Sequence, residues 1–201
     1  MTRQLALPIS PPPAPTLDNF VPGANAELLA RLRDLAAGRL AESVLYLWGV
    51  AGSGRSHLLR ASARHGLAVA DDVERLDDAA QIALFNAINH ARESGGTVLA
   101  AGDAPPARLA LREDLRSRLG WGLVYQVRPL SDAQKAAYLR GEAARRGIKL
   151  ADGVVEYLLT HVRRDLHSLT ALLEQLDRAS LEQHRPVTLP LVREALRSDE
   201  R

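Results

Sequence analysis

The sequence predicts an α/β domain with a mostly parallel sheet of about four strands, followed by a small all-helical domain. Apolar runs typical of strands recur at 44–48, 67–72, 97–101 and 123–127, with helical patterns between them. Glycines directly after the first run mark a tight strand-to-helix loop. From Ser131 onward the pattern is helical throughout. Because strands that alternate with helices indicate a parallel sheet, we expect a terminal segment over 1–16, an α/β domain over 17–129 and a helical domain over 130–201.

The composition limits what the chain can be. Its 201 residues suffice for one α/β domain and a small appendage, and its formal net charge is +2. Lys135 and Lys149 are the only lysines, and no dense basic block indicates a nucleic-acid-binding surface. The absence of cysteine excludes disulfides and thiolate metal sites. No apolar run reaches membrane-spanning length and no signal peptide is recognisable, so we expect a soluble cytoplasmic protein without a membrane partner.

The N-terminus combines a leucine-bearing peptide with a proline-rich linker. Gln4-Leu5-Ala6-Leu7-Pro8 precedes residues 9–15, which are too rich in proline to form a helix or a central strand. At about 3.1 Å per residue, such a linker can hold the first residues roughly 25 Å from the domain. A tethered peptide with two leucines suits docking into a groove on a partner. The alternative is a disordered tail with incidental leucines.

Residues 49–56 carry the strongest functional signal. They follow the pattern Gly-x-x-x-x-Gly-Lys-Ser of a phosphate-binding loop, except that Arg55 replaces the lysine. In such a loop backbone N–H groups approach phosphate oxygens, the helix N-terminus adds positive potential, and the Ser56 hydroxyl can bind Mg²⁺. Arginine keeps the positive charge of lysine but carries it on a planar guanidinium group instead of a compact ammonium group. This difference favours nucleotide binding over fast hydrolysis. A plain glycine-rich turn is the alternative.

Carboxylates follow the second and third predicted strands. The strand over 67–72, expected to be buried, ends in Asp71 and Asp72, where an aspartate that acts on Mg²⁺ is expected after a phosphate loop. The strand over 97–101 leads into Gly102-Asp103, and a polar side chain there can sense the γ-phosphate or the attacking water. The alternatives are a capping pair for the next turn and a simple turn residue.

Helix signals fill the remaining intervals. Asn25 is predicted to cap a helix that ends at Gly38 and has on one face Leu28, Leu29, Leu32 and Leu35. Asp77 or Asp78 is predicted to cap a helix that ends at Gly95-Gly96 and carries Ile82, Phe85 and Ile88. Residues 109–119 predict a short helix that bears several arginines.

The C-terminal domain shows helix caps and a leucine stripe. Ser131 with Gln134 predicts a capping box, and Asp152 and Thr188 are further cap candidates. Leucines at helical spacing between 165 and 183 predict a core stripe. Arg163 and Arg164 precede this helix, where cations oppose its dipole, so we expect at least one of them to have another partner, such as a phosphate.

Five features follow one another along the chain: the glycine-rich loop, the paired aspartates, Gly102-Asp103, Ser117-Arg118 and a helical domain with Arg164. In this order they resemble the features of AAA+ ATPases of the DnaA branch, and within that branch those of Hda-like proteins. The resemblance runs nearly end to end and is carried by residues 4–8, 52–59, 117–122 and 173–180. It implies an AAA+ P-loop domain followed by a helical lid. In the family, an extra strand and helix usually precede Asp71. Only residues 61–66 separate Asp71 from the loop helix here, so we expect a sheet shortened at its edge.

The resemblance also implies roles for the matched residues. The peptide that docks on the DNA-polymerase sliding clamp is carried by Gln4, Leu5, Leu7 and Pro8. Residues expected around ADP or ATP are Gly49, Gly52, Gly54, Arg55, Ser56, His57 and Asp72, with Phe20, Val21 and Asn25 near the adenine. Ser56 and Asp71 would hold Mg²⁺, Asp103 would be sensor I, Arg164 sensor II and Arg118 the arginine finger.

Two classes of function follow from these residues. The first is a clamp-tethered regulator with little turnover of its own, which triggers hydrolysis of ATP held by the initiator DnaA and meets DNA only through the clamp. The alternative is a stand-alone ATPase of the clamp-loader or helicase-loader type. Arg55 and the absence of a glutamate directly after Asp71 argue against this alternative. An initiator that binds DNA itself would need a helix-turn-helix domain after the lid, which we do not expect. Self-association is left open.

Overall fold

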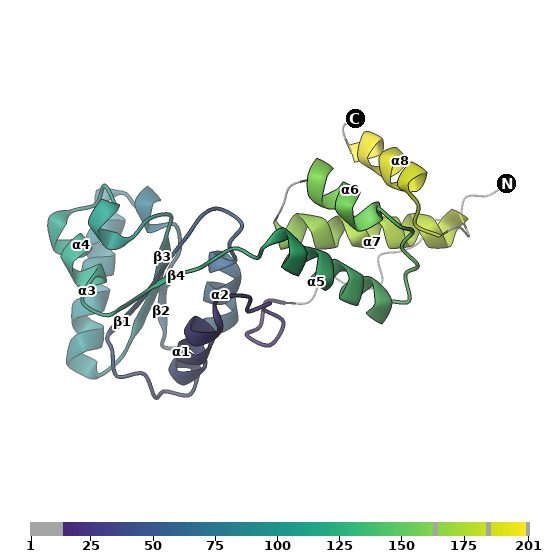
Figure 1. The fold of residues 1–201 in the computed structure, drawn as a ribbon. Helices are drawn as coiled ribbons and strands as arrows, with labels where there is room; N and C mark the ends of the chain where they lie inside the picture. Colours follow the sequence, from purple (N-terminus) through teal and green to yellow (C-terminus); the bar gives the residue numbers. More distant parts are fainter. Residues whose placement is uncertain (1–13, 163–164, 184–185, 200–201) are drawn as a thin grey trace. The chain divides into compact units, whose positions relative to one another are not determined.

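The computed structural model describes residues 14–162, 165–183 and 186–199. The chain divides into two compact units, with the boundary between Pro129 and Leu130 (Figure 1). The first unit holds two apolar clusters and the second holds one of its own. Each unit therefore has the buried apolar side chains that stabilise a separate fold.

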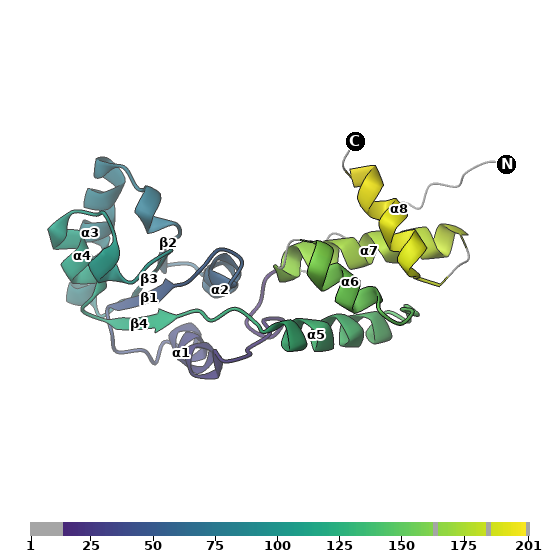
Figure 2. The same cartoon turned by 45° about the horizontal axis from the view of Figure 1, so that its top comes forward.

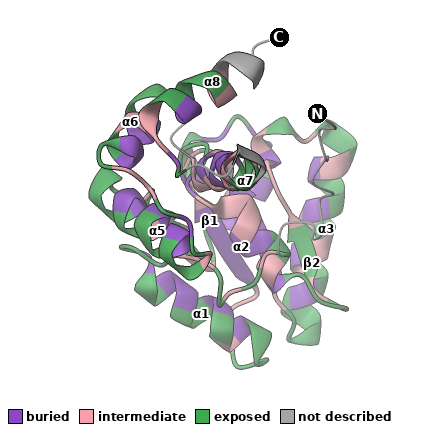
Figure 3. Ribbon diagram, turned by 90° about the vertical axis from the view of Figure 1, so that its right-hand side faces the viewer, coloured by how far each residue is buried: buried purple, intermediate pink, exposed green. Residues whose placement is uncertain are grey.

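A four-stranded parallel sheet forms the centre of the first unit. Its strands are β1 (Val44–Trp48), β2 (Ala68–Ala70), β3 (Val98–Gly102) and β4 (Leu123–Gln126), in the order β2-β3-β1-β4. In β1, Tyr46 pairs with Ala100 of β3 on one side and with Val124 of β4 on the other. β1 is buried almost throughout, as the purple ribbon in Figure 3 shows. The predicted parallel sheet of about four strands is confirmed.

Helices cover both faces of this sheet (Figures 1 and 2). α1 (Ala26–Ala36) and α2 (Arg55–Ser62) pack on one face, and α3 (Asp78–Ser94) and α4 (Glu113–Leu119) pack on the other. Because side chains alternate along a strand, Leu45 and Leu47 join the first core, whereas Val44 and Tyr46 join the second. Short 3₁₀ turns, η1 (Val73–Arg75) and η2 (Pro106–Arg108), follow β2 and β3.

Strand β2 differs from its prediction. The run over 67–72 predicts a buried strand, but β2 spans only Ala68–Ala70 and Val69 is 40% exposed. The reason is its place at the edge of the sheet, where it has a neighbour on one side only. The short connection from α2 supplies no strand to pair with its free side. The prediction of burial is therefore wrong, although the prediction that the sheet is shortened at its edge agrees with this arrangement.

The helices of the first unit follow the predicted signals with two differences. Asp77 caps α3, because its carboxylate accepts a hydrogen bond of 2.8 Å from the Ala80 N–H. Ile82, expected on the apolar face of this helix, is 44% exposed. The helix predicted over 109–119 begins only at Glu113, and residues 109–112 form an irregular connection between η2 and this helix.

The second unit is helical, as predicted. It contains α5 (Asp132–Arg145), α6 (Val154–His161), α7 (Leu166–Gln183) and α8 (Leu189–Asp199). Ser131 and Gln134 form the predicted capping box at the start of α5. Asp152 does not cap α6, since Gly153 occupies that position with φ +77°. The core stripe of α7 consists of Leu169, Leu172, Leu173 and Leu176. Within the described ranges, no helix is long and apolar enough to cross a membrane.

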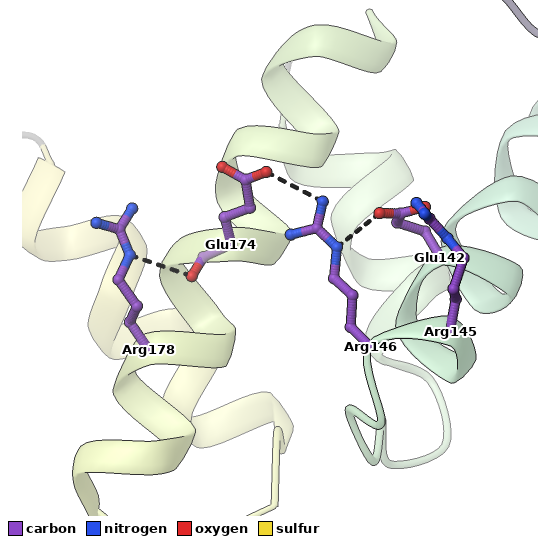
Figure 4. A network of polar contacts seen from close by, with 5 residues as sticks. All are labelled: Glu142, Arg145, Arg146, Glu174 and Arg178. Atoms are coloured by element: carbon purple, nitrogen blue, oxygen red, sulfur yellow. Dashed lines mark hydrogen bonds and ion pairs between the residues drawn. The ribbon is translucent and has the colours of Figure 1, made fainter. Parts of the chain in front are cut away.

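A network of charged side chains joins α5 to α7 (Figure 4). The Glu142 side chain is only 5% exposed and accepts hydrogen bonds from Arg145 and from Arg146, the latter at 2.6 Å. Arg146 also donates to Glu174 of α7 at 3.1 Å. Burial alone would raise the pKa of Glu142, but the two arginines outweigh it and hold the pKa below its ordinary value of 4.5. The ionised carboxylate therefore stabilises the folded unit.

We predict that Glu142→Gln lowers the free energy of unfolding of the second unit by about 2 kcal/mol at pH 7, because two charge-assisted hydrogen bonds lose their acceptor charge. Since the folded-state pKa is depressed, this stabilisation is complete above the unfolded-state pKa of about 4.3 and is lost as the pH falls through the folded-state value. Urea titrations of both proteins from pH 7 to pH 3 measure the difference.

Glu156→Gln is the matched control. Glu156 pairs with Arg140, and both side chains are more than half exposed. Loss of an exposed pair costs less than about 1 kcal/mol. If the two variants lose the same stability, or if the effect of Glu142→Gln is unchanged at pH 3, the network does not depend on a buried carboxylate.

Candidate functional site

The loop between β1 and α2 is shaped by close contacts of its backbone. Gly49 is buried, and a Cβ atom there would lie 2.6 Å from the Val127 carbonyl oxygen. Gly52 and Gly54 have φ values of +76° and +103°, which side-chain-bearing residues rarely adopt. The Gly49 N–H donates to the Gly102 carbonyl at the end of β3. The loop is thus held against the ends of two neighbouring strands and leads directly into the first turn of α2.

The segment before α1 lies against this loop. A Cβ atom on Gly54 would lie 2.8 Å from Cε2 of Phe20, so the Phe20 ring packs directly on the loop. The Phe20 ring also lies 5.6 Å from the His57 ring, and Nε2 of His57 is 3.0 Å from the Thr16 carbonyl oxygen. His57 therefore contacts the N-terminal segment, and Val21 beside Phe20 is half-buried. The structure brings together Phe20, His57 and the loop.

Asn25 has a different structural role from the predicted helix cap. Its side chain makes no capping hydrogen bond to α1. Instead Nδ2 donates to the carbonyls of Pro22 at 3.0 Å and Arg128 at 2.8 Å, while Oδ1 accepts from the Arg128 N–H at 2.7 Å. Asn25 is buried and thereby fastens the segment that carries Phe20 to the strand end after β4. Asn25 thus occupies the predicted N-cap position of α1, but its side chain does not cap the helix, because these tertiary partners take it.

Arg55 lies at the start of α2 with its side chain only 11% exposed. Its guanidinium is 3.8 Å from the Asp72 carboxylate, and its Nη1 atom is buried without a hydrogen-bond partner among the described residues. Asp72 is the one non-glycine residue in the described ranges with positive φ, at +47°. This backbone conformation turns the chain from β2 into η1 and places the carboxylate beside the loop. The structure therefore brings together Arg55 and Asp72.

The ends of β1 and β3 add further polar groups. Glu74 of η1 accepts a hydrogen bond of 3.3 Å from the Asp103 N–H. The Tyr46 hydroxyl donates to the Ala104 carbonyl at 2.8 Å. Burial, with the charges of Glu74 and Asp103, raises the pKa of Tyr46, and the Arg55 charge only partly opposes this. Tyr46 therefore stays neutral as a donor. The sequence did not indicate Glu74, because its partner Asp103 lies 29 residues away.

The two residues assigned to Mg²⁺ come from different elements of the first unit. Ser56 follows Arg55 in the first turn of α2, and Asp71 follows the last residue of β2. Oδ1 of Asp71 accepts a hydrogen bond of 3.0 Å from the Asp72 N–H, and Oδ2 is the oxygen that could bind a metal ion. No group of three or more His, Asp or Glu side chains in the described part of the chain could hold a metal by itself. Mg²⁺ bound with a nucleotide needs only one or two protein ligands, so these donors fit it.

Arg118 at the end of α4 is stacked on aromatic rings. Its guanidinium carbon lies 3.7 Å from the centre of the Trp121 ring and 5.3 Å from that of Phe85. No ion pair joins Arg118 to Glu113 or Asp114 on the same helix, and Asp114 pairs with Arg112 at 3.0 Å instead. Nη1 of Arg118 is buried and has no hydrogen-bond partner among the residues described. This cation therefore has no fixed anionic partner within the described chain.

Two groups of assigned residues cannot be placed. The clamp-binding residues Gln4, Leu5, Leu7 and Pro8 lie outside the described residues, and so does Arg164. Their assignments stay predictions from the sequence.

Comparisons with known proteins agree with this fold. Domain III of DnaA from Thermotoga maritima has a TM-score of 0.75 and 21% identity, and the match covers 94% of this chain and 98% of that one. A DnaA bound to AMPPCP and single-stranded DNA has a TM-score of 0.70 and 19% identity; 83% of this chain matches 65% of that one. The RuvB branch migration motor of Thermotoga maritima has a TM-score of 0.66 and 16% identity, over 92% of this chain and 72% of that one. The fold is thus that of an AAA+ domain of the DnaA type.

The family is shown by sequence. A profile described as "Hda, lid domain" matches residues 132–196. An uncharacterized protein of Haemophilus influenzae is 35% identical over 230 residues, covering 98% of this chain and 99% of that protein. The chain belongs to the Hda-like family of DnaA-homologous AAA+ proteins. Since the alignment is longer than this chain, the relative carries residues with no counterpart here, which fits the shortened sheet edge.

Proposed function

We propose that this protein is a nucleotide-bound regulator of chromosome replication initiation, which stimulates hydrolysis of ATP held by the initiator DnaA. Arg118 enters the initiator's nucleotide site as an arginine finger, and the N-terminal peptide tethers the protein to the sliding clamp. The observation that carries the proposal is the set of contacts that the Arg118 guanidinium makes and lacks. It is a half-buried cation that stacks on Trp121 and takes part in none of the ion pairs among the described residues, since the nearby Asp114 pairs with Arg112. A phosphate group of a partner's nucleotide would supply the anionic partner.

The protein's own nucleotide has the role of a structural ligand in this proposal. A DnaA of the same fold is described as bound to AMPPCP. Here the loop from Gly49 to His57 would hold the phosphates, Phe20, Val21 and Asn25 would shape the adenine side, and Ser56 and Asp71 would hold Mg²⁺. The metal supplies positive charge to the phosphates when it is bound. Asp103 and Arg164 would act as sensors I and II.

Arg55 supports nucleotide binding with slow turnover. Its guanidinium lies between the loop and Asp72, so phosphate and carboxylate compete for the same cation. A competing carboxylate weakens the hold on the terminal phosphate, where hydrolysis needs the strongest charge stabilisation. In this proposal ADP is the resting ligand, and the catalytic contribution of the protein comes from Arg118.

A motor function is the second candidate, and Glu74 is the observation in its favour. Its carboxylate lies beside Asp103, near the end of β3, where a base that activates water could act. The hydrogen bond from the Asp103 N–H, however, already occupies Oε2 of this carboxylate. If purified protein hydrolyses ATP steadily without a partner, and Glu74→Gln removes this turnover, the motor function is correct and the regulator is not.

We predict opposite effects on ADP affinity for the two members of the Arg55 ion pair. Arg55→Ala removes charge-assisted contacts to phosphate and should weaken binding at least tenfold. Asp72→Asn removes the competing charge, keeps a residue that tolerates positive φ, and should strengthen binding by about threefold. Calorimetric titration measures both values. Arg75→Ala is the control, because Arg75 is 4.0 Å from the same carboxylate but 78% exposed. Equal affinity of all four proteins would show that Arg55 does not contact the nucleotide.

We predict that replacing both Leu5 and Leu7 by alanine abolishes binding to the sliding clamp and leaves the melting temperature within about 2 °C of wild type, since the peptide lies beyond a proline linker. Surface-bound clamp and a thermal melt measure the two properties. Ile9→Ala within the linker serves as the control. A collapse of the melting temperature would mean that the peptide is part of the fold.

We predict that Arg118→Ala removes at least a thousandfold of the stimulated hydrolysis, or roughly 4 kcal/mol of transition-state stabilisation. The measurement is release of phosphate from ATP-loaded initiator in the presence of DNA-loaded clamp. Arg112→Ala is the matched control, because Arg112 lies on the same stretch but pairs with Asp114. Stimulation by Arg118→Ala equal to that of wild type would refute the assignment of the finger.

A further inference from the structure

A second arginine lies near Arg118, and the family resemblance gives it no role. The guanidinium carbon of Arg92, on α3, lies 5.0 Å from the centre of the Trp121 ring, the same ring on which Arg118 stacks at 3.7 Å. In the part of the chain that the structure describes, neither arginine has a carboxylate within 4.0 Å. Trp121 is 52% exposed, although large apolar side chains are usually covered. We call Arg92, Arg118 and Trp121 the Trp121 face.

The backbone fixes the position of Trp121. Its N–H donates to the Arg118 carbonyl at 3.1 Å, which closes the end of α4 and keeps the two residues together. The next residue, Gly122, packs so tightly against β1 that a Cβ atom would lie 2.0 Å from the Val44 carbonyl oxygen. The ring thus projects from a rigid point of the sheet, and its exposure follows from the fold.

Two like charges share this aromatic ring, and no carboxylate among the described residues forms an ion pair with either of them. Attraction to the ring face offsets part of the cost of each cation, but the two guanidinium groups repel one another. The surface that complements this arrangement is anionic. A phosphate chain supplies several oxygens close together and accepts hydrogen bonds from more than one arginine.

We propose that the Trp121 face is the surface that receives the triphosphate-bearing site of the ATP-bound initiator. Trp121 is a positioning residue that holds the guanidinium of Arg118 ready for transfer to phosphate, and Arg92 adds a second positive charge that favours docking. The proposal rests on the proposed function, since it names the surroundings that Arg118 requires. It differs from that function in assigning separate roles to Trp121 and Arg92, which do not enter the finger contact itself.

The test measures initiator ATP hydrolysis as a function of the concentration of this protein. Trp121→Leu should lower the maximal rate about tenfold, the loss expected when a cation loses a well-placed aromatic face, with little change in the half-maximal concentration. Trp121→Phe keeps an aromatic face and should retain most of the rate. Arg92→Ala should raise the half-maximal concentration about threefold to tenfold and leave the maximal rate unchanged, as expected of a docking charge. Arg60→Ala is the charge-matched control, because Arg60 is exposed on α2 at the opposite face of the sheet.

A second readout does not depend on activity. Trp48 and Trp121 are the only tryptophans, so Trp48→Phe leaves Trp121 as the sole indole fluorophore. In that background Arg118→Ala should increase the quenching of Trp121 by acrylamide in the free protein, since a guanidinium at 3.7 Å no longer covers the ring. Unchanged quenching would overturn the stacked arrangement even if Trp121→Leu failed to fold.

The two proposals fail in different ways. If the wild-type protein does not stimulate hydrolysis, the proposed function is wrong, and if Arg118→Ala stimulates hydrolysis as well as wild type does, the assignment of Arg118 as the finger is wrong. If Arg118→Ala is inactive while Trp121→Leu and Arg92→Ala behave as wild type does, the finger stands and the proposal for the Trp121 face is wrong.

Discussion

The central position of β1 between β3 and β4 is the constraint on which the rest of the first unit depends. Because the three strands are parallel, the loop after β1 meets the end of β3 on one side and the strand end after β4 on the other. Gly49 can sit against the Val127 carbonyl only because it has no side chain. The same register places Asp103 and Arg128 beside the loop, and Asn25 then ties the N-terminal segment to Arg128. Parallel α/β sheets bind ligands at this edge because the polar ends of several strands meet there.

Two arginines illustrate how surroundings decide the role of one residue type. Arg55 is nearly buried and faces a carboxylate, so its charge is partly neutralised within the domain. Arg118 is stacked on Trp121 and faces no carboxylate within the described residues, so its charge is not neutralised there. Under the proposed function, a bound nucleotide would use the first cation for affinity, and the second would act on a neighbouring protein's nucleotide. This division would let an AAA+ fold act on ATP that another protein holds.

Local patterns predicted much of this fold, and long-range contacts account for the failures. The parallel sheet, the Ser131 capping box and the Asp77 cap follow from residues close together in sequence. The roles of Asn25 and Glu74 depend on partners 103 and 29 residues away, which no local pattern reveals. The exposure of β2 follows from its edge position, which is a property of strand order. Likewise, the sequence shows an arginine close before Gly120-Trp121-Gly122, but it does not show that Arg92 and Arg118 both contact the Trp121 ring.

The central claim is that this protein acts on a nucleotide bound to its partner. A single-turnover experiment tests it most directly: the initiator is loaded with ATP labelled at the γ-phosphate, this protein is loaded with unlabelled ADP, and the two are mixed with DNA-loaded clamp. The account predicts release of labelled phosphate at a rate that depends on the concentration of this protein, up to one phosphate per initiator. Release of label only when labelled ATP is first bound to this protein would contradict the account.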